Sequence, residues 1–456
     1  MKKLLALAIL ISLFSCKREK PTKFAVISGM IYNSNSDKLT LYNEYDTEDR
    51  KTIALSEEAT FQDTIYLDWN HRYLMIEGKN RYHLFLSEGD DISIEYDSKK
   101  MDSTLLISGT GSQASNYLTK KGALTKDEDF VALSKEDEAN FKQHVSDLKK
   151  QKLELLTSIS GLSDNFIASE TSNIQYEYLK DVSSYELYHG YYTNNREFKV
   201  SEGFEDELLA LTFNKEKEFK FSPAYRDLVS SHYIDKVSKN KDTVTPTDIQ
   251  VLKQFSTIEK EFIKNELLYQ QAKYGITYTD DVETYYRVFS SGSTNKKYNE
   301  KIAKAYNGLT LLTKGNPSPK FTDYENYAGG TTSLDDLKGN YVYIDVWATW
   351  CGPCKAEIPS LKKVEKQYHG KNIEFVSVSI DVRKDHEKWK KMIKDMELGG
   401  TQLFADDNWK STFIEDYMIK GIPRFILIDP LGNIVNSNAP RPSNKKLTQL
   451  FDELEI

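Results

Sequence analysis

Two cysteines separated by two residues constrain the fold of this 456-residue chain more than any other feature. Cys351 and Cys354 follow an apolar run at 341–347 that is typical of a strand, and a helix-like stretch at 354–368 comes next. The third cysteine, Cys16, is far away in the sequence, so cysteines cannot supply the four ligands of a structural zinc site. The pair therefore predicts a dithiol that opens and closes at a strand-to-helix junction.

Such a junction supplies what a reactive thiol needs. The unpaired amides and the positive dipole end of the helix lower the pKa of a nearby thiol from its usual value of about 8.5. Gly352 and Pro353 suit the tight first turn, where a proline costs no hydrogen bond. We expect Cys351 to be exposed and to attack a disulfide. Cys354, one turn inside the helix, is expected to be less accessible and to resolve the mixed disulfide.

Two acidic residues are candidates for proton transfer to these thiols. Asp345 interrupts the apolar run, and burial there would raise its pKa and suit it to exchange a proton with Cys354. Glu357 lies three residues after Cys354 on the same helical face and is a second titrating neighbour. Each has an ordinary alternative, namely an aspartate at a strand end in solvent and a solvated glutamate on a helix.

The beginning of the chain predicts export. Lys2 and Lys3 precede an apolar run at 4–14 that is too short to cross a bilayer but suits a signal peptide. Residues 13–16 resemble the lipobox of bacterial lipoproteins, which implies cleavage before Cys16 and a lipid on its sulfur; an ordinary signal peptide is the alternative. We therefore expect a protein of the cell envelope, lipid-anchored at Cys16 and facing the periplasm. A net charge of −8 gives no indication of nucleic-acid binding.

Changes in composition predict a multidomain protein. Short alternating strands with regularly spaced turns predict an N-terminal antiparallel β-sandwich-like domain, and Lys/Glu-rich stretches with helical spacing predict a helical middle region without a catalytic motif. The last part alternates strands and helices, which predicts a mostly parallel central sheet with helices on both faces, and its late strand–turn–strand adds an antiparallel edge. The predicted divisions are a signal peptide at 1–15, a tether at 16–23, the β domain at 24–110, the helical region at 116–312, a Gly/Pro-containing linker at 313–321 and the α/β domain at 322–456.

The residues around the cysteines resemble the active-site segment of thioredoxins. The match extends from Asp345 to Pro359, and residues 421–423 match the loop whose cis-proline packs against the dithiol in that family. Together with Glu357, an extra segment at 381–417 makes this part similar to the extracytoplasmic TlpA/ResA-like thiol-disulfide oxidoreductases. More loosely, the β-rich region resembles a domain of lipoproteins from Bacteroidetes-type bacteria. The resemblance implies a C-terminal thioredoxin-like fold, a redox-active Cys351–Cys354 disulfide, no cofactor or metal, and the active-site neighbours Trp350, Gly352, Pro353, Ile422 and Pro423.

Two positions depart from the family pattern. Arg424 follows the expected cis-proline at a position where many thioredoxins carry threonine, so the partner preference is expected to differ. Ala348 stands three residues before Cys351, where the peroxiredoxin relatives of this fold need threonine or serine. Peroxidase activity is therefore not expected.

These features predict a reductase of protein disulfides that works outside the cytoplasm. Because such an enzyme cannot reach NADPH, the family resemblance implies a membrane-embedded thiol carrier as its electron donor. A disulfide oxidase or isomerase is the alternative within the same chemistry, since the direction depends on the reduction potential. A different class also stays open, in which the chain is an envelope binding module and its redox domain is auxiliary.

Overall fold

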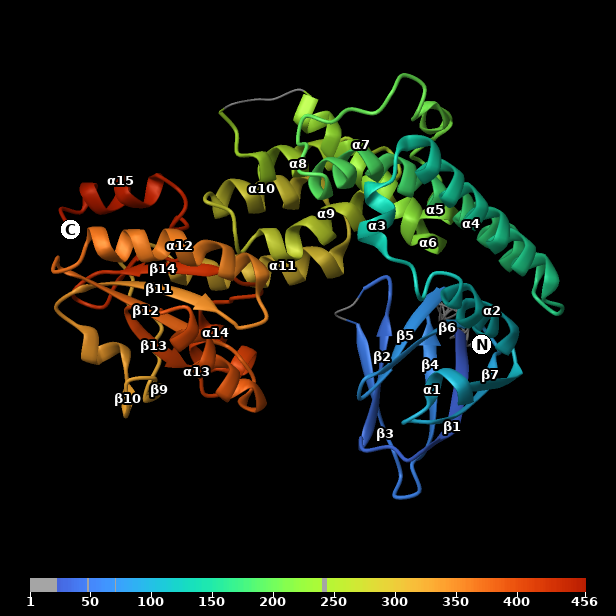
Figure 1. The fold of residues 1–456 in the computed structure, drawn as a ribbon, viewed down its shortest axis with the longest axis horizontal. Coiled ribbons are helices and arrows are strands. Elements are labelled where there is room, and N and C mark those ends of the chain that lie inside the picture. The colour runs from blue at the N-terminus through green and yellow to red at the C-terminus, as the bar shows by residue number, and fades with distance from the viewer. Residues whose placement is uncertain (1–22, 47–48, 70, 240–243) are drawn as a thin grey trace, which may run out of the picture. The chain divides into compact units, whose positions relative to one another are not determined.

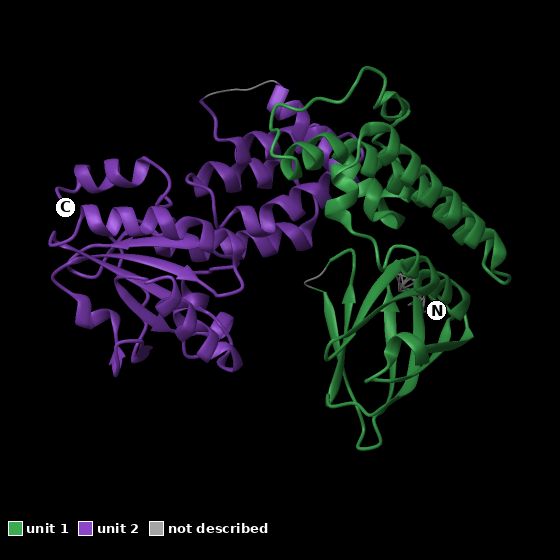
Figure 2. Ribbon diagram, in the orientation of Figure 1, with its two compact units in different colours: residues 1–229 green, residues 230–456 purple. Residues whose placement is uncertain are grey.

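The computed structural model describes the chain except for residues 1–22, 47–48, 70 and 240–243 (Figure 1). It consists of two compact units, Met1–Val229 and Ser230–Ile456 (Figure 2). The predicted signal peptide and the lipidation site Cys16 lie outside the described residues. Within the described part of the chain, no helix is both long and apolar enough to cross a membrane. The finer division into six segments stays a prediction.

The first unit begins with the two sheets of the β domain. Their strand orders are β4-β1-β7-β8 and β3-β2-β5-β6, and the apolar side chains of both sheets form one buried cluster. Neighbouring strands are antiparallel except for β1 and β7, which run parallel. The strands are β1 (Lys23–Tyr32), β2 (Lys38–Asn43), β3 (Arg50–Ala54), β4 (Thr60–Leu67), β5 (His71–Glu77), β6 (Asn80–Leu86), β7 (Asp91–Asp97) and β8 (Leu106–Thr110). The N-terminal β-rich architecture predicted from the alternating pattern is confirmed.

Helices follow the sheets in the first unit. They are α1 (Met101–Thr104), which comes just before β8, then α2 (Ser112–Ala123), α3 (Phe130–Lys135), α4 (Glu138–Ser158), α5 (Asp164–Tyr192), the 3₁₀ helix η1 (Asp206–Ala210) and α6 (Glu216–Phe221). The next helix, α7 (Pro223–Lys239), begins in the first unit and ends in the second. The fully buried Glu170 on α5 binds Arg72 of β5 and Lys121 of α2. A buried carboxylate needs such cationic partners, so this cluster ties the helices to the sheets.

Four helices of the second unit precede its sheet. They are α8 (Thr247–Ser256), α9 (Glu261–Gly275), α10 (Val282–Gly292) and α11 (Lys296–Leu309), followed by the 3₁₀ turn η2 (Thr310–Leu312). Side chains define two of the helix starts: Asp281 accepts a hydrogen bond from the Thr284 amide (2.9 Å), and Asn295 accepts one from the Tyr298 amide (3.2 Å). The predicted helical middle region is confirmed as helical.

A seven-stranded sheet forms the rest of the second unit, in the order β10-β9-β13-β12-β11-β14-β15. The strand β12 runs parallel to both of its neighbours, β11 and β13. Every other pair of neighbouring strands in this sheet is antiparallel. The three central strands are parallel, as predicted, and the predicted antiparallel strand–turn–strand is present at β14 and β15. The sheet as a whole is not mostly parallel, because β14 also runs antiparallel to β11 and because β9 and β10 pair antiparallel at the other edge. The strands are β9 (Tyr324–Asn326), β10 (Thr331–Thr332), β11 (Tyr341–Trp347), β12 (Ile373–Ser379), β13 (Thr401–Phe404), β14 (Arg424–Ile428) and β15 (Ile434–Asn436).

Helices cover both faces of this sheet (Figure 1). Alternate residues of β11 enter two apolar clusters, with Ile344 in one and Tyr343 in the other. The first cluster includes α13 and α14, and the second includes α15 and the later part of α12. The helices are α12 (Gly352–Gln367), α13 (His386–Asp395), α14 (Thr412–Asp416) and α15 (Lys446–Glu453), with 3₁₀ turns η3 (Leu334–Leu337), η4 (Arg383–Asp385) and η5 (Asn408–Lys410). The predicted C-terminal thioredoxin-like fold is confirmed.

The stretch predicted as a linker is hydrogen bonded to the last strand of the sheet. The Gly315 amide donates to the Ile434 carbonyl (2.8 Å), and the Ile434 amide donates to the Asn316 carbonyl (2.8 Å). Pro317 forms an antiparallel bridge with Asn433. This segment is therefore hydrogen bonded to the sheet of the second unit, and its role as a linker stays a prediction.

Candidate functional site

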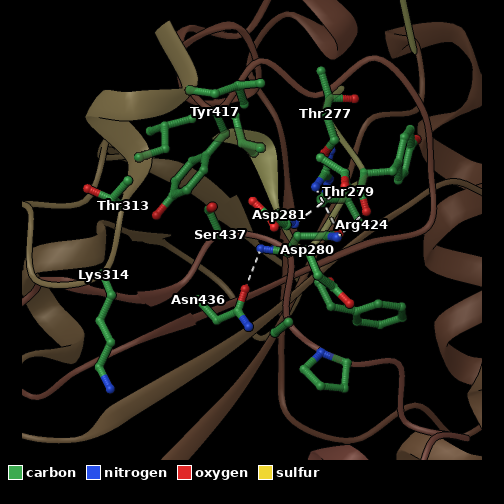
Figure 3. Close-up of a pocket in the computed structure, with 18 of the residues that line it drawn as sticks. Thr277, Thr279, Asp280, Asp281, Thr313, Lys314, Tyr417, Arg424, Asn436 and Ser437 are labelled. Carbon is green, nitrogen blue, oxygen red and sulfur yellow. Dashed lines mark hydrogen bonds between the residues drawn. The ribbon is translucent and has the colours of Figure 1, made fainter. Parts of the chain in front are cut away.

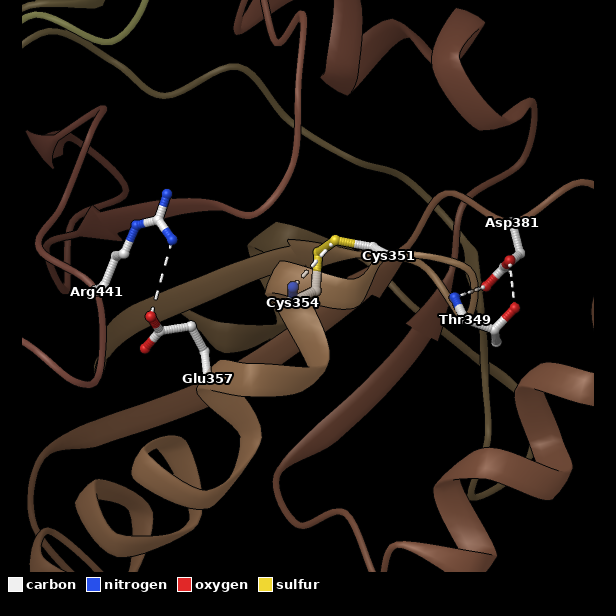
Figure 4. The surroundings of a disulfide bond; sticks show 6 residues. All are labelled: Thr349, Cys351, Cys354, Glu357, Asp381 and Arg441. Atoms are coloured by element: carbon white, nitrogen blue, oxygen red, sulfur yellow. Dashed lines mark hydrogen bonds and ion pairs between the residues drawn. A yellow bond between two sulfur atoms is a disulfide. The ribbon is translucent and has the colours of Figure 1, made fainter. Parts of the chain in front are cut away.

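Cys351 and Cys354 form a disulfide at the N-terminus of α12 (Figure 4). Their Cα atoms are 5.3 Å apart. Cys351 is the residue that caps the helix, and its Sγ accepts a hydrogen bond from the Cys354 amide (3.1 Å). An amide of the first helical turn aimed at Sγ is the environment that stabilises a thiolate once the disulfide is reduced.

The two cysteines differ in position but not in exposure. Cys351 is 4% exposed and Cys354 is 3% exposed, because both belong to the apolar cluster on one face of the sheet. The expectation of an exposed Cys351 is therefore wrong for the disulfide form. Three of the predicted neighbours reach solvent, since Trp350 is 51% exposed and both Gly352 and Pro353 are exposed, whereas Pro423 is buried.

Asp345 lies on β11, where its neighbours are Ser377 on β12 and Phe425 on β14. It is 7% exposed, which excludes the alternative of a solvated strand-end aspartate. Its Oδ1 has no hydrogen-bond partner among the described residues. Burial, followed by the negative charges of Glu357 and Glu365, raises the pKa of Asp345 to about 8. Both protonation states of this carboxyl are therefore populated near neutral pH.

The carboxylate of Glu357 contacts Ser443 and Arg441, which lie between β15 and α15. Its Oε2 accepts a hydrogen bond from the Ser443 amide (3.0 Å), and its Oε1 accepts one from Ser443 Oγ (2.9 Å). Arg441 Nη1 lies 3.8 Å from Oε1 (Figure 4). Glu357 acts on the site through its charge, which raises the pKa of Asp345.

The predicted proline loop lies at the same edge of the sheet as the dithiol. The Ile422–Pro423 peptide bond is cis. Arg424 begins β14 directly after it and pairs with Val346, one residue before the end of β11. Ile422 packs against the apolar cluster that contains both cysteines.

Arg424 connects this loop to the segment between α9 and α10. Its guanidinium donates hydrogen bonds to the carbonyl of Thr277 and to Asn438 Oδ1 (2.9 Å), and its Cζ lies 4.5 Å from the centre of the Tyr278 ring. Burial lowers the pKa of Arg424 to about 10, so it stays charged at neutral pH. Arg424 also lines a cavity of about 900 Å³ to which residues 276–283 contribute (Figure 3). The sequence marked Arg424 as unusual but gave no indication of these partners.

A second buried aspartate, Asp381, holds the turn before the cysteines. Its carboxylate accepts hydrogen bonds from the Thr349 amide (2.9 Å) and Thr349 Oγ1 (2.8 Å), as Figure 4 shows. It accepts a third from Ser379 Oγ (2.8 Å). Sequence reasoning missed this residue. The signal that could have found it is a carboxylate placed directly after the apolar run of β12.

Comparisons with known proteins agree with this geometry. Residues 339–434 match the family model described as thioredoxin-like. The thioredoxin-like protein YneN of Bacillus subtilis is 28% identical over 141 residues, which are 31% of this chain and 80% of the relative. The thiol-disulfide oxidoreductase ResA of the same organism is 27% identical over 128 residues, which are 28% of this chain and 68% of the relative.

One solved structure among those similar to this chain is the thioredoxin domain of a thiol-disulfide oxidoreductase from Bacteroides vulgatus. It is 31% identical, with a TM-score of 0.29, and the match covers 31% of this chain and 98% of that one. The C-terminal domain of this chain is thioredoxin-like over residues 339–434, and its sequence is similar to that of the ResA thiol-disulfide oxidoreductases.

Proposed function

We propose that this protein reduces protein disulfides outside the cytoplasm, with Cys351 as the attacking thiol and Cys354 as the resolving thiol. The observation that carries the proposal is the asymmetry of the pair. Cys351 Sγ occupies the helix-capping position and accepts an amide hydrogen bond, whereas Cys354 lines a small cavity that it shares with Asp345. One sulfur is thus placed to be a thiolate, and the other is placed to exchange a proton.

The reaction begins with the reduced pair. The Cys351 thiolate attacks one sulfur of the substrate disulfide, a mixed disulfide forms, and the other substrate sulfur leaves as a thiolate and takes a proton from water. Cys354 then gives its proton to the Asp345 carboxylate and attacks Sγ of Cys351. The Cys351–Cys354 disulfide forms and the second substrate thiolate leaves and is protonated. The substrate has gained two electrons, which the two cysteines have lost, and two protons. Of the two protons that the cysteines release, one leaves Cys351 when its thiolate forms and the other leaves Cys354 during resolution.

The dithiol must then be reduced again. We assign this step to a membrane-embedded thiol carrier, which returns two electrons and two protons by the same exchange in reverse. A lipid on Cys16, in the envelope and facing the periplasm, would keep the domain near such a donor. The similarity to ResA supports this arrangement.

The reduction potential tests the direction of the reaction. The soluble chain, beginning after Cys16, is equilibrated with glutathione buffers, and the fraction of oxidised Cys351–Cys354 is measured by thiol alkylation. A reductase is expected near the thioredoxin value of about −270 mV. A value near about −120 mV, typical of a strong oxidant, would overturn the reductase assignment in favour of an oxidase or isomerase.

Serine variants test the assignment of the two thiols. With insulin as the disulfide substrate, Cys351→Ser is expected to lower the rate of reduction roughly 1,000-fold or more, because the nucleophile is lost. Cys354→Ser is expected to accumulate a mixed disulfide between Cys351 and insulin, visible on non-reducing gels. If wild-type protein binds a disulfide substrate but never reduces it, the chain is a binding module instead.

A further inference from the structure

A small cavity lies between α12 and the sheet, behind Cys354. Its volume is about 10 Å³, close to what one water molecule needs. Cys354, Leu361 and Glu365 line it from one face of α12, because residues at intervals of three, four and seven lie on the same side of a helix. Asp345 lines it from β11. The cavity therefore lies beside the resolving cysteine and two carboxyl groups.

Three buried polar atoms around this cavity have no hydrogen-bond partner within the described part of the chain. They are Asp345 Oδ1, Trp347 Nε1 and Gln402 Oε1, and all three residues line the cavity. An unpaired buried polar atom destabilises the fold, and buried waters commonly satisfy such groups. One donor and two acceptors around a water-sized space provide the contacts that a bound water molecule requires.

Glu365 has its carboxylate against two glycines. A Cβ atom on Gly399 would lie 2.7 Å from Glu365 Oε2, and one on Gly400 would lie 3.3 Å from Oε1. The carboxylate therefore lies close to the backbone of residues 399 and 400, beside the cavity that Gly399 also lines. Burial raises the pKa of Glu365 to about 7, against the opposing effect of Lys362, and the side chain is half-buried.

We propose that Glu365 is the outer residue of a proton path that leads from Cys354 through Asp345 and one water molecule to solvent. This inference rests on the proposed role of Asp345. During resolution the Cys354 thiol gives its proton to the Asp345 carboxylate, which passes it through the water to Glu365. Glu365 releases the proton at the surface, so Asp345 is ionised again for the next cycle. The electron pair stays with the sulfur atoms, and the path moves protons only.

Few other charged groups surround this path. The titratable side chains that line the cavity are Cys354, Asp345, Lys362 and Glu365, whereas β12 and residues 398–402 contribute no charged side chain to it. Outside the cavity, Glu357 acts on Asp345 through its charge. The pH dependence of resolution should therefore follow the two carboxyl groups.

The test separates attack from resolution. The reduced soluble chain reacts with 5,5′-dithiobis(2-nitrobenzoate): attack by Cys351 releases the first coloured thiolate, and attack by Cys354 on the mixed disulfide releases the second. Glu365→Gln is expected to slow the second release roughly tenfold at pH 7. The first release should be unchanged, and the pH profile of the second should lose the inflection near neutrality. Glu453→Gln, an exposed glutamate on α15, is the matched control and should alter neither release.

Further variants make each outcome decisive. Glu365→Asp keeps a carboxyl group and should restore part of the second release. If the second release is normal in Glu365→Gln but slow in Asp345→Asn, the role of Glu365 is overturned and the proposed function stands. A normal second release in Asp345→Asn would overturn the relay within the proposed function itself. Equal slowing of both releases in Glu365→Gln would mean a general disturbance of the fold and would also overturn the inference.

Discussion

The two buried aspartates near the dithiol, Asp345 and Asp381, have opposite surroundings. Asp381 is 1% exposed and accepts three hydrogen bonds from Thr349 and Ser379. Asp345 is 7% exposed, and its Oδ1 has no partner among the described residues. A carboxylate surrounded by donors is fixed as an acceptor and holds its neighbours in place. A buried carboxyl without donors is costly to ionise, which makes it available for proton exchange.

The largest expected effect is on stability, and it concerns Asp345, the aspartate whose Oδ1 has no partner among the described residues. The pKa of Asp345 is about 8 in the folded protein, against about 3.9 for an unfolded aspartate. The contribution of protonated Asp345 to the free energy of unfolding is therefore fully present below pH 4 and is lost as the pH rises towards 8. By pH 7 the loss amounts to about 4 kcal/mol. Asparagine does not ionise, so the unfolding free energy of Asp345→Asn should not fall between pH 4 and pH 7. The difference in unfolding free energy between variant and wild type should therefore grow by about 4 kcal/mol over this range, in favour of the variant.

Urea unfolding of the oxidised chain at several pH values measures this difference. The wild-type and Asp345→Asn curves should converge at pH 4 and separate progressively up to pH 8. Curves that stay parallel across this range would mean that Asp345 is not the buried titrating group.

Replacing Asp381, the aspartate with hydrogen-bond partners, should lower the unfolding free energy, whereas replacing Asp345 should raise it. Asp381→Ala leaves the amide and hydroxyl of Thr349 and the hydroxyl of Ser379 without their acceptor. We expect a loss of about 3 kcal/mol in unfolding free energy, because buried donors lose bonds to a charged group. The same urea titration at pH 7 measures it. An Asp381→Ala protein as stable as wild type would remove the distinction between the two aspartates.

The buried guanidinium of Arg424 allows the same comparison for a positive charge. Arg424 has partners on both terminal nitrogens and should therefore be structural. Arg424→Met is expected to lower the unfolding free energy by about 2 kcal/mol and to make the segment at 276–281 easier to cleave with protease. Release of the second coloured thiolate should be unaffected. As a control, Arg383→Met replaces a guanidinium that is 73% exposed and should change stability by less than about 0.5 kcal/mol. If Arg424→Met slowed thiol release without lowering stability, Arg424 would not be a purely structural residue.

The smallest expected effect concerns the link between Glu357 and Asp345. Glu357→Gln removes a negative charge that raises the pKa of folded Asp345. In this variant the pH at which the loss of stability ends should therefore move down from about 8, and the total loss should be smaller than in wild type. The lost contact with Arg441 should cost about 0.5 kcal/mol. Ser443→Ala is the control, because it removes one hydrogen bond and keeps the charge of Glu357. An equal shift of the midpoint in both variants would show that the charge is not the cause.

The part of the site with a local signal could be predicted from the sequence. Two cysteines at a strand-to-helix junction and a charge within an apolar run are visible without any tertiary contact, so Cys351, Cys354 and Asp345 were candidates at once. Glu365 was not, because a glutamate on an amphipathic helix looks like an ordinary solvated residue. Gln402 comes from β13, which has four residues and lacks a clear alternating pattern.

The same limit applies to the fold. Strands of the β domain and the helices after them follow from hydrophobic periodicity, which each segment carries by itself. The pairing of β1 with β7 and the contact of Arg424 with Thr277 join residues far apart in the sequence. Burial of Cys351 likewise depends on the sheet beneath it, so the helix-terminus argument alone predicted exposure.

The pairing of the supposed linker with β15 decides where the redox domain can be separated from the rest of the chain. β15 is an outer strand of its sheet, and an uncovered strand edge invites pairing with another molecule. Residues 315–317 cover that edge. A fragment that starts at 322 would leave it open and should self-associate, whereas one that starts at 313 should stay monomeric. The boundary of this domain is set by the residues that close its sheet.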